Sequence, residues 1–242
     1  MWVNNVKKLL KKILKNAIFT KLFNLLHIKY NGKKSNQIKI NSLIRGRGKF
    51  FFAKKSVNND VFVDSNSVIK KLTLNVFGNN NIIVIEKGCY IEDLTVWIEN
   101  DNNTVIIGKN SQFCGTCKLS CIEGTKITIG ESCLFSSEID VRTGDGHAIL
   151  DEKALRINHS KDVKIDEHVW VGYRAMILKG SHIHKNSVVG ANSTVTGDAG
   201  ESAVAVAGTP AKIIKRNINW HFDRDFVKKK GKSFEKIAGD IM

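Results

Sequence analysis

The residue best suited to chemistry is His147, which lies in the polar segment 142–164 within the run Thr143-Gly144-Asp145-Gly146-His147. An imidazole titrates near neutral pH, so it can remove the proton of a hydroxyl group as that oxygen attacks an electrophile. Asp145 could orient the ring or stabilise its charged form, although Asp-Gly is also a common turn sequence. The segment therefore predicts a general base at His147 with Asp145 as its partner, and His159 is the local rival.

This segment interrupts a six-residue repeat, and the repeat indicates what must hold the base in place. Aliphatic residues recur every six positions at Ile165, Val171, Ile177, Ile183, Val189 and Val195. The residues four positions later are Val169, Ala175, Ser181, Ser187 and Ser193. Turn-like positions every six residues are too close for ordinary hairpins, and they favour a triangular parallel β-helix. Weaker matches upstream extend the expected β-helix to 59–208. Insertions in solenoids form loops that often bind ligands, so 142–164 is the expected catalytic loop.

Three further side chains are candidates for binding the molecule that reacts. Trp170 directly precedes a register position, so its indole should face outward, where it can stack on a ring of a bound molecule, line a binding channel or pack against another subunit. Arg156 and Asn158 are polar residues of the expected catalytic loop. We expect these three residues to contact the acceptor, which is the molecule whose hydroxyl group attacks the electrophile.

Composition limits the remaining classes. The 242 residues carry a formal net charge of +15, but the lysines gather at the two ends and no nucleic-acid-binding signature is present, so we expect no nucleic-acid partner. Cys114, Cys117 and Cys121 have spacings that hint at a metal, but no fourth ligand is evident. We expect five free thiols in a reducing cytoplasm and no metal.

The chain is expected to have terminal segments on either side of the β-helix. If residues 1–30 are helical, their apolar side chains form a stripe on one face and the lysines lie on the opposite face. This pattern predicts a basic amphipathic helix. This helix could lie on the inner face of an anionic membrane or cap the solenoid. No apolar run reaches the ~18 residues of a spanning helix, and no secretory signal is evident. Residues 31–58 are expected to be a linker with first strands, and 209–242 a C-terminal tail.

Three motifs together resemble a known family. They are Val169-Trp170-Val171-Gly172, Val189-Gly190-Ala191-Asn192-Ser193-Thr194-Val195, and Ala207-Gly208-Thr209-Pro210-Ala211-Lys212, in order after His147. The set resembles hexapeptide-repeat acyltransferases, in particular bacterial O-acetyltransferases of capsule and lipopolysaccharide sugars, including polysialic acid. The resemblance implies a left-handed β-helix, a homotrimer with active sites between subunits, and acetyl-coenzyme A as donor. Thr209 stands where this family usually has Asn, Ala148 where Pro is common, and Asp166 and His184 where Gly is frequent.

The same motifs predict a donor channel of small residues followed by basic ones. Small residues would let the pantetheine arm lie close to the backbone, and the basic residues could pair with phosphates or form an ordinary basic tail. Gly172 is also a candidate for stabilising the oxyanion. The expected donor-binding residues are Gly172, Ala175, Lys179, Gly190, Ala191, Ser193, Ala207, Gly208, Thr209, Pro210, Lys212, Lys215 and Arg216.

The resulting hypothesis is an enzyme that transfers acetyl from acetyl-coenzyme A to a hydroxyl of a bacterial surface sugar. Alternative acceptors are an amino-sugar nitrogen, serine or an antibiotic hydroxyl, and a non-catalytic solenoid is a less favoured hypothesis. A γ-type carbonic anhydrase needs three histidines around zinc, whereas only His182 and His184 are close in sequence. The sequence does not specify the sugar, the hydroxyl, or whether the acceptor is a polymer, a lipid-linked unit or a nucleotide sugar.

Overall fold

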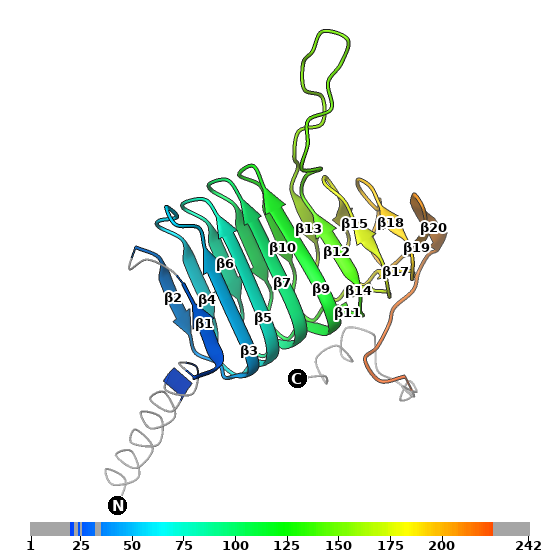
Figure 1. The fold of residues 1–242 in the computed structure, drawn as a ribbon. Coiled ribbons are helices and arrows are strands. Elements are labelled where there is room, and N and C mark those ends of the chain that lie inside the picture. Colours follow the sequence, from blue (N-terminus) through cyan, green and yellow to red (C-terminus); the bar gives the residue numbers. More distant parts are fainter. Residues whose placement is uncertain (1–19, 22–23, 25, 32–34, 225–242) are drawn as a thin grey trace, which may run out of the picture.

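The computed structural model describes residues 20–21, 24, 26–31 and 35–224, and its strands wind into a parallel solenoid with three faces (Figure 1). Face 3 is a seven-stranded sheet. In spatial order its strands are β16 (His182–Ile183), β13 (Val163–Ile165), β10 (Lys126–Ile129), β8 (Thr104–Ile107), β6 (Ile82–Ile85), β4 (Asp60–Val63) and β2 (Gln37–Ile40).

Faces 1 and 2 share a 13-stranded sheet, because its longest strands run across the corner between them. These long strands are β3 (Ile44–Phe52), β5 (Val68–Phe77), β7 (Tyr90–Glu99) and β9 (Gln112–Ile122). Face 1 continues with β11 (Leu134–Phe135), β14 (Trp170–Val171), β17 (Val188–Val189) and β19 (Ala205–Gly208). Face 2 also holds β1 (Ile28–Tyr30), β12 (Ile139–Arg142), β15 (Met176–Ile177) and β18 (Thr194–Val195). Strand β20 (Ala211–Lys215) pairs antiparallel with β19.

The core is a column of apolar side chains that point inward from all three faces. The six register residues from Ile165 to Val195 are at most 3 % exposed, and Phe113 and Phe135 stack with ring centroids 4.5 Å apart. Each coil therefore buries its apolar side against its neighbours, as expected for a repeat whose units cannot form a core alone. The expected parallel β-helix of hexapeptide repeats is confirmed.

Coils in the two halves of the solenoid differ in length, which explains why the repeat is clear only in the second half of the sequence. Ile91 pairs with Phe113, 22 residues later, whereas Val171 pairs with Val189, 18 residues later. Eighteen residues make three hexads, so the six-residue period survives there. In the longer coils face 2 is a continuous strand, and the extra residues break the period.

A ladder of buried asparagines stabilises the corner between faces 2 and 3. The side-chain oxygens of Asn36, Asn59 and Asn81 each accept a hydrogen bond from the amide nitrogen of the next asparagine, at 2.9–3.0 Å, ending at Asn103. Because buried amides must find partners, this regular stacking fixes the register of the coils. The side-chain oxygen of Asn103 accepts from the backbone N–H of Thr125 at 3.2 Å, one coil before the segment 142–164 departs from the same corner.

The solenoid is longer than the expected range 59–208, since β1, β2 and β3 precede it and β20 follows it. The early coils belong to the core because Ile44, Phe50 and Phe52 are buried. The last three residues of the segment 1–30 form β1, which pairs with Gly48–Phe50. Residues 20–21, 24 and 26–27 are helical, and the rest of the expected amphipathic helix lies outside the described residues. Among the described residues, no helix has the length and apolar character needed to cross a membrane.

Candidate active site

The segment 142–164 projects far from the solenoid as a single long loop between β12 and β13 (Figure 1). Its outer part is a hairpin, in which Leu150 and Arg156 form an antiparallel bridge. The carboxylate of Asp151 accepts hydrogen bonds from the backbone N–H groups of Lys153 and Leu155, both at 2.9 Å, and so closes the tip. The expected insertion is therefore an ordered arm.

The base of the arm is fixed by Asn158, which is 8 % exposed. Its amide nitrogen donates to the Asp145 carboxylate at 2.7 Å and to the backbone carbonyl of His147 at 2.8 Å. Its side-chain oxygen accepts from the backbone N–H of Ile149 at 2.7 Å. Asn158 was expected to contact the acceptor, but the structure uses its side chain to position the backbone on both sides of His147.

Asp145 is held by a second group, the ammonium of Lys179, which also donates to the carbonyl of Asn158 at 2.9 Å. Hydrogen bonds from Lys179 and Asn158 lower the pKa of Asp145, so its carboxylate is ionised at neutral pH. Asp145 thus contacts Lys179 and Asn158, where sequence reasoning expected a contact with the His147 ring. Lys179, expected in the donor channel, lies instead at the base of the arm.

Glu123 anchors the returning side of the arm, and sequence reasoning missed it. Arg156 donates two hydrogen bonds to this carboxylate at 2.5 and 3.0 Å, and the Ser160 hydroxyl donates a third at 2.6 Å. These contacts lower the pKa of Glu123 to about 2. Arg156, a predicted acceptor residue, is therefore committed to an ion pair within the chain.

The Glu123 anchor gives the arm a defined pH dependence. Because its folded-state pKa lies below the ordinary 4.5, its stabilising contribution is complete above that value and is lost as the pH falls towards 2. We expect amide exchange in residues 145–160, corrected for intrinsic rates, to be constant from pH 8 to 5. Glu123→Gln should speed that exchange at pH 7. Equal exchange in the variant and the wild type, measured by mass spectrometry, would show that Glu123 does not anchor the arm.

His147 itself is exposed, and it follows Gly146, whose φ of +81° is a conformation that favours glycine. In the part of the chain that the structure describes, its backbone carbonyl is held by Asn158 and its imidazole makes no hydrogen bond. A ring presented on a fixed backbone with free nitrogens can accept a proton from a bound hydroxyl. His159 is also exposed but lies on the returning side of the arm.

A single chain does not bring together all the predicted site residues. Trp170 faces outward as expected, with 38 % of its surface exposed, but it lies on β14 in face 1. The arm departs from the corner between faces 2 and 3, which is opposite face 1 in a three-sided solenoid. Trp170 packs near Trp220, with ring centroids 6.2 Å apart, and Trp220 was not recognised from the sequence.

The small residues predicted for the donor channel lie at the corner between faces 1 and 2. A Cβ on Gly172 would lie 2.7 Å from the carbonyl oxygen of Val189, so glycine here lets successive coils approach closely. Ala175 and Ser193 are 1 % exposed, so the predicted approach of the pantetheine arm would be to their backbone and not to their side chains. They are buried because each fills the tight inner turn of its coil.

The C-terminal hairpin carries the other donor candidates. Gly208 pairs with Ala211 across the turn formed by Thr209 and Pro210, and Thr209 contacts Thr194 on β18 at 3.3 Å. Beyond this turn, Lys212 and Arg216 line a hollow of about 410 Å³. The remaining candidates in this region are Gly190, Ala191, Ala207 and Lys215, on or beside β17, β19 and β20.

The cysteines offer no alternative nucleophile in the core. Cys89, Cys117, Cys121 and Cys133 are buried, and all five thiols are free. Burial raises the pKa of Cys89, Cys117 and Cys133 to about 12, so these thiols stay protonated at neutral pH. These buried thiols are therefore poor candidates for a nucleophile.

Comparisons with known proteins agree with this architecture. Residues 162–197 match the family model described as bacterial transferase hexapeptide (six repeats). A polysialic acid O-acetyltransferase of Escherichia coli O1:K1 / APEC is 42 % identical over 95 residues, which are 39 % of this chain and 31 % of that protein. The chain thus spans about a third of that relative's length.

A polysialic acid O-acetyltransferase of Neisseria meningitidis is 32 % identical over 164 residues, covering 67 % of this chain and 75 % of the relative. The crystal structure of the polysialic acid O-acetyltransferase OatWY superposes with a TM-score of 0.67 and 29 % identity, covering 84 % of this chain and 92 % of that one. The solenoid is therefore the left-handed β-helix that the motifs indicated. By fold, repeat and relatives, the chain belongs to the hexapeptide-repeat acyltransferase family.

Proposed function

We propose that this protein is an O-acetyltransferase that moves the acetyl group of acetyl-coenzyme A to a hydroxyl of a bacterial capsule or lipopolysaccharide sugar. The observation that carries the proposal is the exposed His147 on a backbone fixed by Asn158 within an acyltransferase solenoid. Relatives that acetylate polysialic acid support a sugar acceptor.

The reaction needs one base and no covalent enzyme intermediate. His147 accepts the proton of the sugar hydroxyl as its oxygen attacks the thioester carbonyl carbon. The tetrahedral intermediate then collapses, the carbon–sulfur bond breaks, and the protonated imidazole returns the proton to the departing coenzyme A thiolate. Backbone N–H groups near Gly172 are the candidates for stabilising the oxyanion. Lys212, Lys215 and Arg216 would bind the coenzyme's phosphates.

A homotrimer would complete this site. Within one chain, face 2 separates the corner that carries Gly172 and Gly190 from the corner that carries the arm. The arm also exposes four large apolar side chains by 55–61 %: Ile149, Leu150, Leu155 and Ile157. Exposed apolar surface on a projecting arm favours packing against another copy. The arm of one copy would then bring His147 to the donor wall of the next.

The proposal is tested with acetyl-coenzyme A and a panel of bacterial glycans, including polysialic acid, amino sugars and serine as a small acceptor. We expect an acetyl ester on a sugar hydroxyl, detected as a mass shift that mild base removes. A base-stable amide on an amino sugar would instead identify a nitrogen acceptor. Absence of transfer to every glycan would refute the sugar O-acetyltransferase.

We also propose that the basic N-terminal segment attaches this cytoplasmic enzyme to the inner face of an anionic membrane. Each lysine near such a surface contributes about 1 kcal/mol, which salt weakens. Full-length protein should float with anionic vesicles at low salt, and removal of residues 1–27, which spares β1, should abolish flotation while transfer to a soluble acceptor persists. Failure of full-length protein to float, or loss of assembly on truncation, would favour the solenoid cap.

A further inference from the structure

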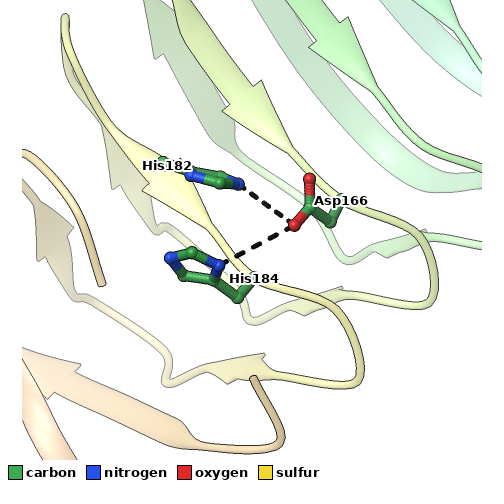
Figure 2. A group of neighbouring side chains, drawn as sticks. All are labelled: Asp166, His182 and His184. Atoms are coloured by element: carbon green, nitrogen blue, oxygen red, sulfur yellow. Dashed lines mark hydrogen bonds and ion pairs between the residues drawn. The ribbon is translucent and has the colours of Figure 1, made fainter. Parts of the chain in front are cut away.

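A cluster of two histidines and a carboxylate lies at the end of face 3, where the proposed reaction makes no use of it. Asp166 directly follows β13, and His182 and His184 flank the inward Ile183 on the next coil, so both rings project outward (Figure 2). The side chains of Asp166, His182 and His184 are 17–27 % exposed. One ligand atom from each lies within 4.8 Å of the others.

The donor atoms converge on one point. Oδ2 of Asp166 lies 3.0 Å from Nε2 of His182 and 3.9 Å from Nδ1 of His184 (Figure 2). Ligands of a tetrahedral zinc ion, bonded at about 2.0–2.1 Å, stand about 3.3 Å apart, so small side-chain rotations would admit the ion. Lys164 binds the other oxygen, Oδ1, at 2.9 Å and leaves Oδ2 directed at the rings.

A second carboxylate, that of Asp198, contacts the nitrogen of the His184 ring that does not face Asp166. Nε2 of His184 lies 2.7 Å from Oδ1 of Asp198, on the following coil, and Nδ1 of His182 lies 3.9 Å from Oδ2 of the same residue. When Nε2 of His184 donates to Asp198, the lone pair of its Nδ1 faces Asp166. Histidines that ligate metals commonly donate their other N–H to a carboxylate in this way, which fixes the tautomer.

The histidine is the unusual residue at this corner. In the two coils before Asp166 the equivalent positions are Gly108 and Gly130, where a Cβ would lie 2.5 and 2.4 Å from the backbone of the following coil. Asp166 and His184 instead place chemically active groups there.

We propose that Asp166, His182 and His184 bind a zinc-class divalent cation, with Asp198 orienting His184. Two imidazoles and a carboxylate suit Zn²⁺ and neighbouring transition metals better than Ca²⁺ or Mg²⁺, which prefer oxygen ligands. The ion would join two consecutive coils and, through Asp198, a third. It would therefore stabilise the C-terminal coils, in which β14 to β18 are two-residue strands.

The test is zinc binding to the full-length chain without an affinity tag, measured by dye competition and by metal analysis after dialysis. We expect one Zn²⁺ per chain and a higher melting temperature with zinc. Asp166→Asn, His182→Gln and His184→Gln should each weaken binding at least 10-fold. Asp198→Asn, at an exposed position that supplies no metal bond, should weaken it by about 10–100-fold. Co²⁺ should give the visible absorption of a tetrahedral site, lost in the first three variants.

His159→Gln and Cys114→Ser are matched controls, since both residues are exposed and lie outside the cluster. Their zinc affinity should equal that of the wild type. Circular dichroism without metal checks that each variant is folded, and the exposed variant Asp198→Asn keeps the test decisive if a ligand variant does not fold. Absence of zinc binding, or binding that the cluster variants leave unchanged, would overturn the proposal.

Discussion

Replacing His147 with alanine is expected to lower kcat for acetyl transfer by about 10²–10⁴-fold, the span that a general base contributes. The fold should be unaffected, because the His147 side chain is exposed and Asn158 contacts only its backbone carbonyl. The assay is initial-rate transfer with the donor saturating, together with the melting temperature and the assembly mass of the variant.

His159→Ala is the matched control for this result. It removes a second exposed imidazole from the same arm and should leave kcat nearly unchanged. If His147→Ala retained a kcat within threefold of the wild type, His147 would not be the base. A large loss in His159→Ala alone would transfer that role to His159.

Leu155→Asp is expected to dissociate the assembly and to lower transfer by about 10²-fold or more. Leu155 is 61 % exposed in one chain, and a charge there would have to be buried if the arm packs on another copy. The mass in solution should fall from about three times 27.0 kDa to that of one chain. Activity should fall with it, because even a small displacement of the base from the donor is costly.

Glu152→Ala serves as the control, since Glu152 lies at the exposed tip of the same arm. It should preserve both the assembly mass and the rate. A Leu155→Asp variant that kept the mass of the wild type and its full activity would contradict a site shared between copies. A site shared between copies would also be contradicted if the wild-type protein sedimented as a monomer and still transferred acetyl.

The β-helix could be predicted from the sequence because its strongest determinant is local. In the 18-residue coils every turn consists of three hexads, so the inward residues from Ile165 to Val195 recur at a fixed period. In the 22-residue coils the period fails. Thr95, four residues after Ile91, fits the template for a corner but lies within β7 on face 2, because that strand continues past the position where a hexad would turn.

The position of the arm could also be predicted, but its internal contacts could not. Asp145 is joined to Lys179 across 34 residues, and Glu123 is joined to Arg156 across 33. Such pairs form only because neighbouring coils stack, and no local pattern identifies them. The same applies to Asp166 and His184, which are 18 residues apart and face each other because one coil separates them.

A single-turnover experiment tests the central claim most directly. The protein is mixed rapidly with labelled acetyl-coenzyme A and an acceptor glycan, quenched in acid, and both the protein and the glycan are analysed by mass spectrometry. Direct transfer predicts that label appears on a sugar hydroxyl, that none is found on the protein at any time, and that His147→Ala slows the step by about 10²–10⁴-fold. Label on a side chain of the protein before it reaches the glycan, or transfer at the wild-type rate without His147, would contradict the account.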